Sequence, residues 1–133
     1  MPDPRPPLPA KQTLLLILLP MLATVFSLRL YLHLVHVRHI YPGGYLVHHL
    51  FVGVLIMVPA ALLLAFGTRH RVLARVGVGV STGLILDEVV YLVATKGSDA
   101  DYVSRTSLIG SLMLVSLAVV FLVILYALHR KER

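Results

Sequence analysis

The dominant pattern along the chain is a series of four long apolar runs, separated by short polar or turn-forming segments. The runs cover residues 13–35, 45–66, 72–95 and 102–128. An α-helix needs ~20 apolar residues to cross a hydrocarbon core of ~30 Å, and each run is long enough. The pattern predicts an all-α integral membrane four-helix bundle, formed by one domain over residues 13–128.

The two ends of the chain differ from these runs. Five of the eight prolines fall within residues 1–12, and proline breaks helices because it lacks an amide proton. We therefore expect a Pro-rich N-terminal tail before the first helix. Basic residues followed by an apolar run are also typical of a signal peptide, but no A-x-A cleavage site follows, which favours a retained helix. Residues 129–133 predict a short basic cytoplasmic tail.

The positions of the basic residues predict the orientation, because Lys and Arg near helix ends are retained in the cytoplasm. When the chain is threaded through four spans, one side receives only Arg38, Lys96 and Arg105, together with Asp99 and Asp101. We expect a multi-pass protein of the cell membrane with both termini cytoplasmic. The basic residues of the cytoplasmic side are Arg5, Lys11, Arg69, Arg71, Arg75, Arg130, Lys131 and Arg133.

Composition agrees with a lipid environment. Hydrophobic residues make up 58% of the chain and charged residues 14%, against about 25% charged residues in a soluble domain. The formal net charge is +6, but the basic residues flank the apolar runs, so the expected partner is the lipid bilayer and not nucleic acid. The absence of cysteine excludes disulfides, thiolate metal sites and thiol catalysis.

Ionisable side chains within the runs converge on the outer half of the predicted bundle. The first run approaches the outer surface at its C-terminal end, the second begins there, the third approaches it again and the fourth begins there. The residues that this threading brings together are Arg29, His33, His36, His48, His49, Asp87, Glu88, Tyr91 and Arg105.

Asp87 and Glu88 are the most informative of these residues. A charged Asp at the centre of a membrane helix costs ~2.5–3.5 kcal/mol on insertion scales, so such residues face the bundle interior and have partners. A structural ion pair with Arg29 or Arg105 is one explanation, but it leaves the second acid and the histidines unexplained. Tyr91, one turn along the helix, is expected to hydrogen-bond to either acid.

The histidines suggest metal ligands, because imidazoles and carboxylates bind Zn or Fe when cysteine is absent. His33 and His36 share one helix face. His48 and His49 are adjacent, so their side chains point ~100° apart on a helix and only one faces inward easily. His49 is the better inward candidate, because Gly53 lies one turn away and allows a neighbouring helix to come close.

The glycines of the third run predict a helix interface. Gly79 and Gly83 form a small-xxx-small pattern, and Asp87 continues the same stripe. The segment does not follow a strand and lacks the P-loop Lys, which argues against a nucleotide-binding loop.

Two segments together resemble a known group of small prokaryotic four-helix membrane proteins. The first is HHxxxG, formed by His48, His49 and Gly53, and the second is a glycine-rich run that ends in Asp87 and Glu88. The likeness covers roughly residues 45–107. It implies that the two histidines and the two acids act as one unit, and it implies no particular activity.

These observations support a transition-metal site in the outer leaflet, holding Zn or Fe through His33 or His36, His48 or His49, Asp87 and Glu88. The metal would activate water or polarise an oxygen of a lipid-like substrate. Glu88 and Tyr91 would assist, while Arg29 or Arg105 would hold an anionic headgroup. One alternative is a proton- or cation-coupled transporter or channel subunit, acting on a small ion as a homo-oligomer. Others are haem ligation by two histidines and a structural subunit, so enzyme activity stays open.

Overall fold

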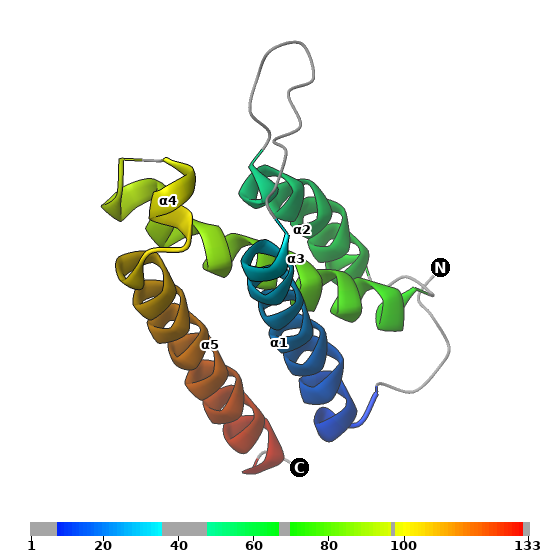
Figure 1. Cartoon of the computed structure of the whole chain (residues 1–133). Helices are drawn as coiled ribbons and strands as arrows, with labels where there is room; N and C mark the ends of the chain where they lie inside the picture. The colour runs from blue at the N-terminus through cyan, green and yellow to red at the C-terminus, as the bar shows by residue number, and fades with distance from the viewer. Residues whose placement is uncertain (1–7, 36–47, 67–69, 97, 132–133) are drawn as a thin grey trace.

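The computed structural model describes residues 8–35, 48–66, 70–96 and 98–131, and all of its regular structure is helical. Four helices form the fold, and a fifth element is a single short turn of helix (Figure 1). In chain order they are α1 (Ala10–Leu34), α2 (His49–Ala65), α3 (Arg71–Ala94), the short α4 (Asp99–Tyr102) and α5 (Arg105–Lys131).

Three of these helices, α1, α3 and α5, are long and apolar enough to cross a membrane. Three of the four apolar runs therefore form helices with the length and apolar composition expected of membrane spans. The second run forms a helix of 17 residues, which is at the lower limit of ~17 residues for a span. Residues 45–47, where the sequence predicts the start of this run, lie outside the described residues.

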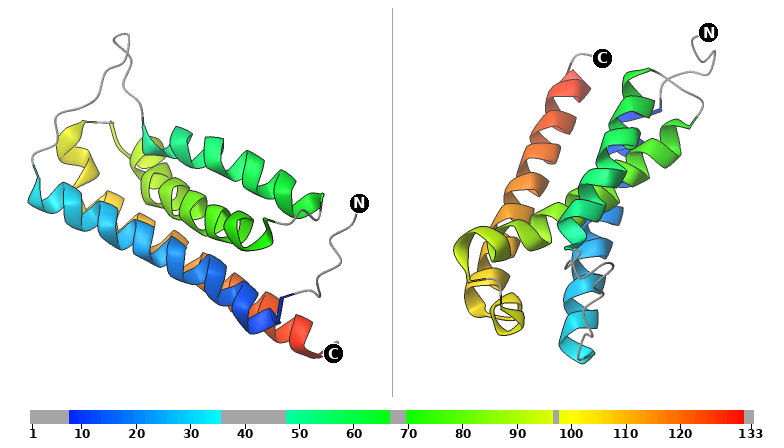
Figure 2. Two further views of the ribbon diagram at one scale, coloured as in Figure 1. Left: turned by 90° about the vertical axis from the view of Figure 1, so that its right-hand side faces the viewer. Right: turned by 90° about the horizontal axis from the view of Figure 1, so that it is seen from above.

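Helix α3 occupies the centre of the arrangement. It packs against α1, α2 and α5, whereas in the described ranges α2 meets neither α1 nor α5. Figure 2 shows α2 and α3 together on one side, with α1 and α5 on the other. The three interfaces therefore all depend on which side chains α3 presents.

Glycines permit the close contact between α1 and α3. A Cβ atom on Gly83 would lie 2.8 Å from the carbonyl oxygen of Met21 and 2.9 Å from Cβ of Thr24. A Cβ atom on Gly79 would collide with the carbonyl oxygen of Ile17. The predicted glycine interface on the third helix is thus confirmed, because any larger side chain would push the two backbones apart.

The contact between α2 and α3 depends on a glycine in the same way. A Cβ atom on Gly53 would lie 2.8 Å from Cγ1 of Ile85 and 3.0 Å from the carbonyl oxygen of Ser81. Gly53 is buried, so α2 approaches α3 closely just below its first turn. This proximity brings the N-terminal end of α2 onto the part of α3 that carries the two acids.

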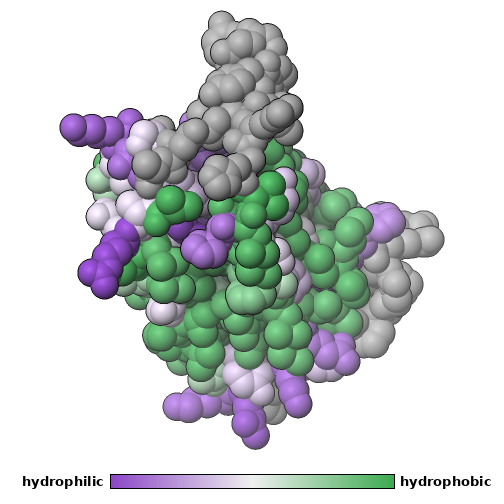
Figure 3. Space-filling view, viewed as in Figure 1, coloured by the Kyte–Doolittle hydropathy of each residue, from purple (hydrophilic) through white to green (hydrophobic). Residues whose placement is uncertain are grey.

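The outward surface of the helices is apolar over most of their length. Large side chains such as Phe26, Phe51 and Phe121 are exposed, while the buried apolar core around Met21, Val25 and Val115 is small. The space-filling view shows this hydrophobic body, with polar residues gathered toward its two ends (Figure 3). Exposed apolar area on this scale is unusual for a soluble monomer and suits contact with lipid.

Two helix boundaries differ from those expected from the sequence. Helix α1 begins at Ala10, within the tail predicted over residues 1–12. The loop expected near residue 99 contains α4, which a capping box starts: the Oγ atom of Ser98 accepts from the Asp101 amide, and the Asp101 carboxylate accepts from the Ser98 amide. This Ser-x-x-Asp pattern is a capping signal that satisfies two unpaired amides at the start of α4.

Candidate functional site

Asp87 connects three other helices to α3. Its side chain is fully buried. Its carboxylate accepts hydrogen bonds from Nε of Arg29 in α1 at 2.5 Å, from Oγ of Ser111 in α5 at 3.2 Å and from the Tyr102 hydroxyl in α4. A buried carboxylate requires such partners, because an unpaired charge in an apolar interior is costly.

Arg29 is held in place by further bonds. Its Nη2 donates to the Asp87 carbonyl oxygen at 2.9 Å and to the Ser107 hydroxyl at 3.2 Å. Its Nη1 donates to the Tyr102 carbonyl oxygen at 3.0 Å, and Cζ lies 4.7 Å from the Tyr102 ring centroid. The structure therefore contains the ion pair that sequence analysis considered, formed with Arg29. Arg105 is exposed at the start of α5, and the ion pairs of Asp87 among the described residues are with Arg29 and His49.

Glu88 closes the N-terminal end of α2. Its Oε2 accepts from the amide of Leu50 at 2.6 Å, and its Oε1 lies 2.6 Å from Nδ1 of His48. His48, at the N-cap position, makes no side-chain capping bond of its own. A carboxylate at a helix N-terminus satisfies free amides and interacts favourably with the helix dipole. This structural role of Glu88 was not foreseen from the sequence.

His49 lies between the two acids. Its Nδ1 is 3.4 Å from Oε2 of Glu88, and its Nε2 is 3.3 Å from Oδ2 of Asp87. The same Nε2 is 3.5 Å from the Tyr102 hydroxyl. One imidazole ring therefore spans the gap between neighbouring carboxylates on α3.

Both adjacent histidines face the acids, which corrects the expectation that only one can. The expectation assumed that His48 and His49 occupy successive helical positions. His48 instead has extended backbone angles, with φ −77° and ψ 139°, and precedes the first helical residue. The separation of ~100° that applies within a helix does not apply across this boundary.

Two tyrosines complete the surroundings of the acids. Tyr91 and Tyr102 are buried and meet edge to face, with ring centroids 5.2 Å apart, and the Tyr91 ring lies 6.1 Å from that of His48. Burial raises the pKa of the Tyr102 phenol, and the charge of Asp87 raises that pKa further, so the hydroxyl remains a donor. Tyr102 was not among the site residues expected from the sequence, and its contacts with Asp87 and His49 add it to the site.

The name polar cluster is used below for the six residues that these contacts join. They are Arg29, His48, His49, Asp87, Glu88 and Tyr102.

The remaining candidate metal ligands do not join the polar cluster in the described parts of the chain. His33 is exposed on α1, and His36 lies outside the described residues. Those residues include no group of three or more His, Asp or Glu side chains arranged to hold a metal ion. A physical reason is that Asp87 already pairs with the Arg29 guanidinium, whose charge repels a metal cation, while Glu88 caps α2.

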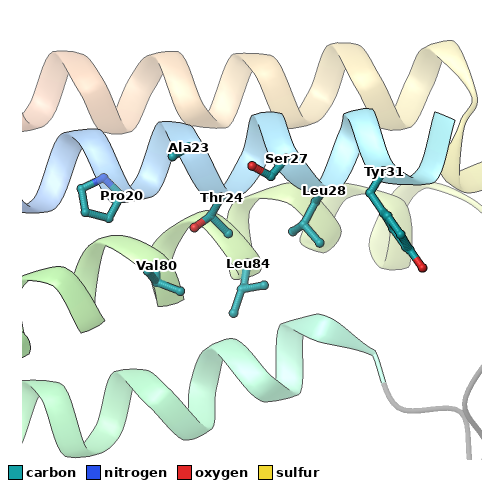
Figure 4. Close-up of a pocket in the computed structure, with 8 residues that line it drawn as sticks. All are labelled: Pro20, Ala23, Thr24, Ser27, Leu28, Tyr31, Val80 and Leu84. Carbon is teal, nitrogen blue, oxygen red and sulfur yellow. The ribbon is translucent and has the colours of Figure 1, made fainter. Parts of the chain in front are cut away.

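Two pockets flank α1. One, of about 300 Å³, lies beside the polar cluster and is lined by Phe26, Arg29, Leu30, Leu32, His33, Tyr102, Val103 and Leu108. The other, of about 490 Å³, is a groove between α1 and α3, where Thr24 and Leu28 of α1 point toward the helix that carries Val80 and Leu84 (Figure 4). The described residues that line this second groove carry no charge.

The polar cluster thus combines two buried acids, a bridging imidazole, a second imidazole at the rim and one guanidinium. Such a set can hold a proton at several neighbouring atoms and pass it between them. In comparisons with known proteins, no family model, no curated protein and no solved structure matches this chain.

Proposed function

We propose that this chain is a multi-pass protein of the cell membrane that moves protons through the polar cluster, as a small proton-coupled transporter or channel subunit. The observation that carries the proposal is the position of His49, whose ring nitrogens lie within 3.4 Å of Asp87 and of Glu88. An imidazole can accept a proton on one nitrogen and release the other proton from the second nitrogen.

The contacts form a continuous series of proton-carrying groups. His48 contacts Glu88 at 2.6 Å, Glu88 contacts His49 at 3.4 Å, and His49 contacts Asp87 at 3.3 Å. Tyr102 follows through its bond to Asp87. Chains of Asp, Glu and His within membrane helices are typical of proton relays in pumps and transporters.

The relay is buried along its length and reachable at its histidines. The side chains of His48 and His49 are 20% and 21% exposed, whereas those of Asp87 and Glu88 are 0% and 4% exposed. A proton would therefore enter or leave at an imidazole, and the low-polarity surroundings of the acids would prevent its loss to water.

The distribution of charge supports the proposed orientation. The start of α1, the start of α3 and the end of α5 lie at one end of the molecule (Figure 2). This end carries Lys11, Arg71, Arg75, Arg130 and Lys131, and the positive-inside rule assigns it to the cytoplasm. The polar cluster then lies in the outer half of the bilayer, and a homo-oligomer is expected to complete the path to the other side.

Proton flux into liposomes tests this proposal. Protein reconstituted with an internal pH-sensitive dye is given a pH gradient, and His49→Gln is compared with the parent chain. Glutamine keeps a polar side chain but does not take up protons, so we expect flux to fall roughly tenfold or more. His129→Gln is the control, because His129 is exposed in the last turn of α5. Equal flux in parent and His49→Gln protein would refute the relay.

A metal-dependent reaction on a lipid-like substrate is the second candidate. It rests on the contacts that His48 and His49 make with Asp87 and Glu88, although the described residues are not arranged to hold a metal ion. Binding a cation there would require Arg29 to release Asp87. Elemental analysis of protein purified without a histidine tag or chelator tests it, since stoichiometric Zn or Fe would favour this candidate over the relay.

A further inference from the structure

The pocket between α1 and α5 has a mixed lining that the proton relay does not explain. Five of its eight lining residues are apolar: Phe26, Leu30, Leu32, Val103 and Leu108. The others are Arg29, His33 and Tyr102. A pocket that is apolar apart from a cation and two groups able to donate hydrogen bonds is suited to a ligand with one anionic end and one hydrocarbon end.

Arg29 retains a donor for such a ligand. A guanidinium has five N–H groups. Among the described residues, its bonds engage the Nε proton with Asp87, both Nη2 protons with Asp87 and Ser107, and one Nη1 proton with Tyr102. One Nη1 proton is left, on a side chain that is 16% exposed and lines the pocket.

Further basic side chains stand near the pocket. His33 lines it one turn after Arg29 on α1 and is exposed. Arg105 is also exposed and lies three residues before the lining residue Leu108, so the two share a face of α5. An anionic group at Arg29 would therefore experience more than one positive or protonatable neighbour.

We propose that this pocket binds an amphiphile through its anionic head, a carboxylate or a phosphate, with the hydrocarbon chain against Phe26, Leu30 and Leu108. Guanidinium groups bind both heads through paired hydrogen bonds. A free hydrophilic anion fits less well, since the three apolar side chains are exposed around the pocket and offer it no hydrogen bonds. The further idea that this amphiphile is the substrate moved with protons rests on the proposed function.

The pocket adjoins the polar cluster through two shared residues. Tyr102 lines the pocket and donates its hydroxyl to Asp87, and Arg29 lines the pocket and pairs with the same carboxylate. A ligand head at Arg29 would compete with Asp87 for the guanidinium. Ligand binding in the pocket would thus be linked to the protonation of Asp87 through the side chain of Arg29.

Binding is measurable with a tryptophan reporter, because the chain contains no tryptophan. Leu30→Trp places the reporter at this pocket, where the Leu30 side chain is half-exposed, so we expect the larger ring to be accommodated. Leu28→Trp is the matched control, because Leu28 lines the uncharged groove of Figure 4. Purified protein in neutral detergent is titrated with dibromostearate and with its methyl ester, since bromine quenches tryptophan on contact.

We expect dibromostearate to quench Leu30→Trp at a concentration roughly tenfold lower than its methyl ester, as a charge-assisted hydrogen bond implies. Leu28→Trp should be quenched equally by both. Adding His33→Gln to Leu30→Trp should reduce the preference. Brominated phosphatidylglycerol against brominated phosphatidylcholine tests a lipid phosphate in the same way, so the two arms separate a free fatty acid from a lipid headgroup.

Equal quenching of Leu30→Trp by the charged and neutral partners in both arms would overturn the proposal. So would an equal preference for the anion at Leu28→Trp, because that result would locate the effect in the detergent micelle. This test is independent of the relay. If proton flux depends on His49 but the pocket shows no preference for the anion, only the proposed ligand is refuted. If the pocket prefers the anion but no proton flux is found, only the relay is refuted.

Discussion

The Nε atom of Arg29 lies 2.5 Å from Oδ1 of Asp87, joining the C-terminal half of α1 to the C-terminal half of the central helix α3. Both side chains sit among apolar helices, and Asp87 is completely buried. Removing one partner of a buried ion pair leaves the other charge uncompensated, which costs about 3–5 kcal/mol. The pair is therefore expected to contribute to stability whatever the cluster does in proton transfer.

A double-mutant cycle on this pair is the first prediction. Arg29→Gln and Asp87→Asn should each lower the free energy of unfolding by about 3 kcal/mol or more. The double variant should cost much less than the sum, because neither change then leaves a lone charge. Thermal or denaturant unfolding in detergent measures all three. Arg105→Gln is the control and should have little effect, since Arg105 is exposed.

His49→Ala separates the two interpretations of the same cluster. His49 contacts Asp87 at 3.3 Å, a longer contact than that of Arg29. We expect His49→Ala to lower the free energy of unfolding by less than Arg29→Gln does. We also expect it to reduce proton flux, so that its main effect is on proton transfer and not on stability.

For the double-mutant cycle, additive losses of unfolding free energy from Arg29→Gln and Asp87→Asn would contradict the ion pair.

The second prediction concerns the glycine contact between α1 and α3. Gly83→Leu should destabilise the fold by about 1–3 kcal/mol or more, because its first side-chain atom already meets the Met21 carbonyl oxygen at 2.8 Å. Val120→Leu is the matched control, as Val120 is exposed on α5. Thermal unfolding of both variants measures the difference, and equal tolerance of the two changes would mean that Gly83 is not at an interface.

Much of the fold follows from the sequence because it depends on local pattern. Apolar length predicts α1, α3 and α5, and the spacing of Gly79 and Gly83 predicts the face that α3 presents. The gathering of His48, His49, Asp87 and Glu88 also follows, since threading alone brings these positions to one level of the bundle.

The pairing within the site could not be predicted in the same way. Arg29 and Arg105 are equivalent partners for Asp87 at the level of threading, and only the rotation of α1 and α5 about their axes distinguishes them. The capping of α2 by Glu88 depends on a docking distance that no spacing encodes. The inward position of Tyr102 follows from α4, whose Ser-x-x-Asp capping box was overlooked.

The third prediction tests the cap on α2. Glu88→Gln removes the charge from the acceptor of the Leu50 amide, which lies 2.6 Å away, and loss of an N-cap typically costs about 0.5–2 kcal/mol. We expect faster hydrogen exchange of the amides of residues 49–52, with little change at residues 56–64. Asp101→Asn weakens the cap of α4 instead, so it should leave α2 unchanged. Unaltered exchange at residues 49–52 would show that Glu88 does not cap the helix.

The fourth prediction is a pH dependence of α4. The Ser98 hydroxyl and then the Ser98 backbone amide donate to the Asp101 carboxylate and lower the pKa of Asp101. A lowered folded-state pKa means that the cap is complete above the ordinary Asp pKa of ~3.9 and is lost as the pH falls through the folded value. The Ser98 amide chemical shift should therefore titrate below ~3.9. Ser98→Ala should raise the Asp101 midpoint toward that value, and a parent midpoint at ~3.9 would contradict the capping box.

The last prediction concerns orientation in the membrane. Reporter domains fused after residues 71 and 133 should be cytoplasmic, and a reporter at Ser98 should be exterior. Arg71, Arg75, Arg130 and Lys131 lie at one end of the bundle, and Lys and Arg resist translocation. α2 must cross with α1, α3 and α5 for this result, although it has 17 described residues and contacts only α3 among the described helices. A Ser98 reporter in the cytoplasm would overturn this orientation, because it would put the end of the bundle that carries the polar cluster on the cytoplasmic side.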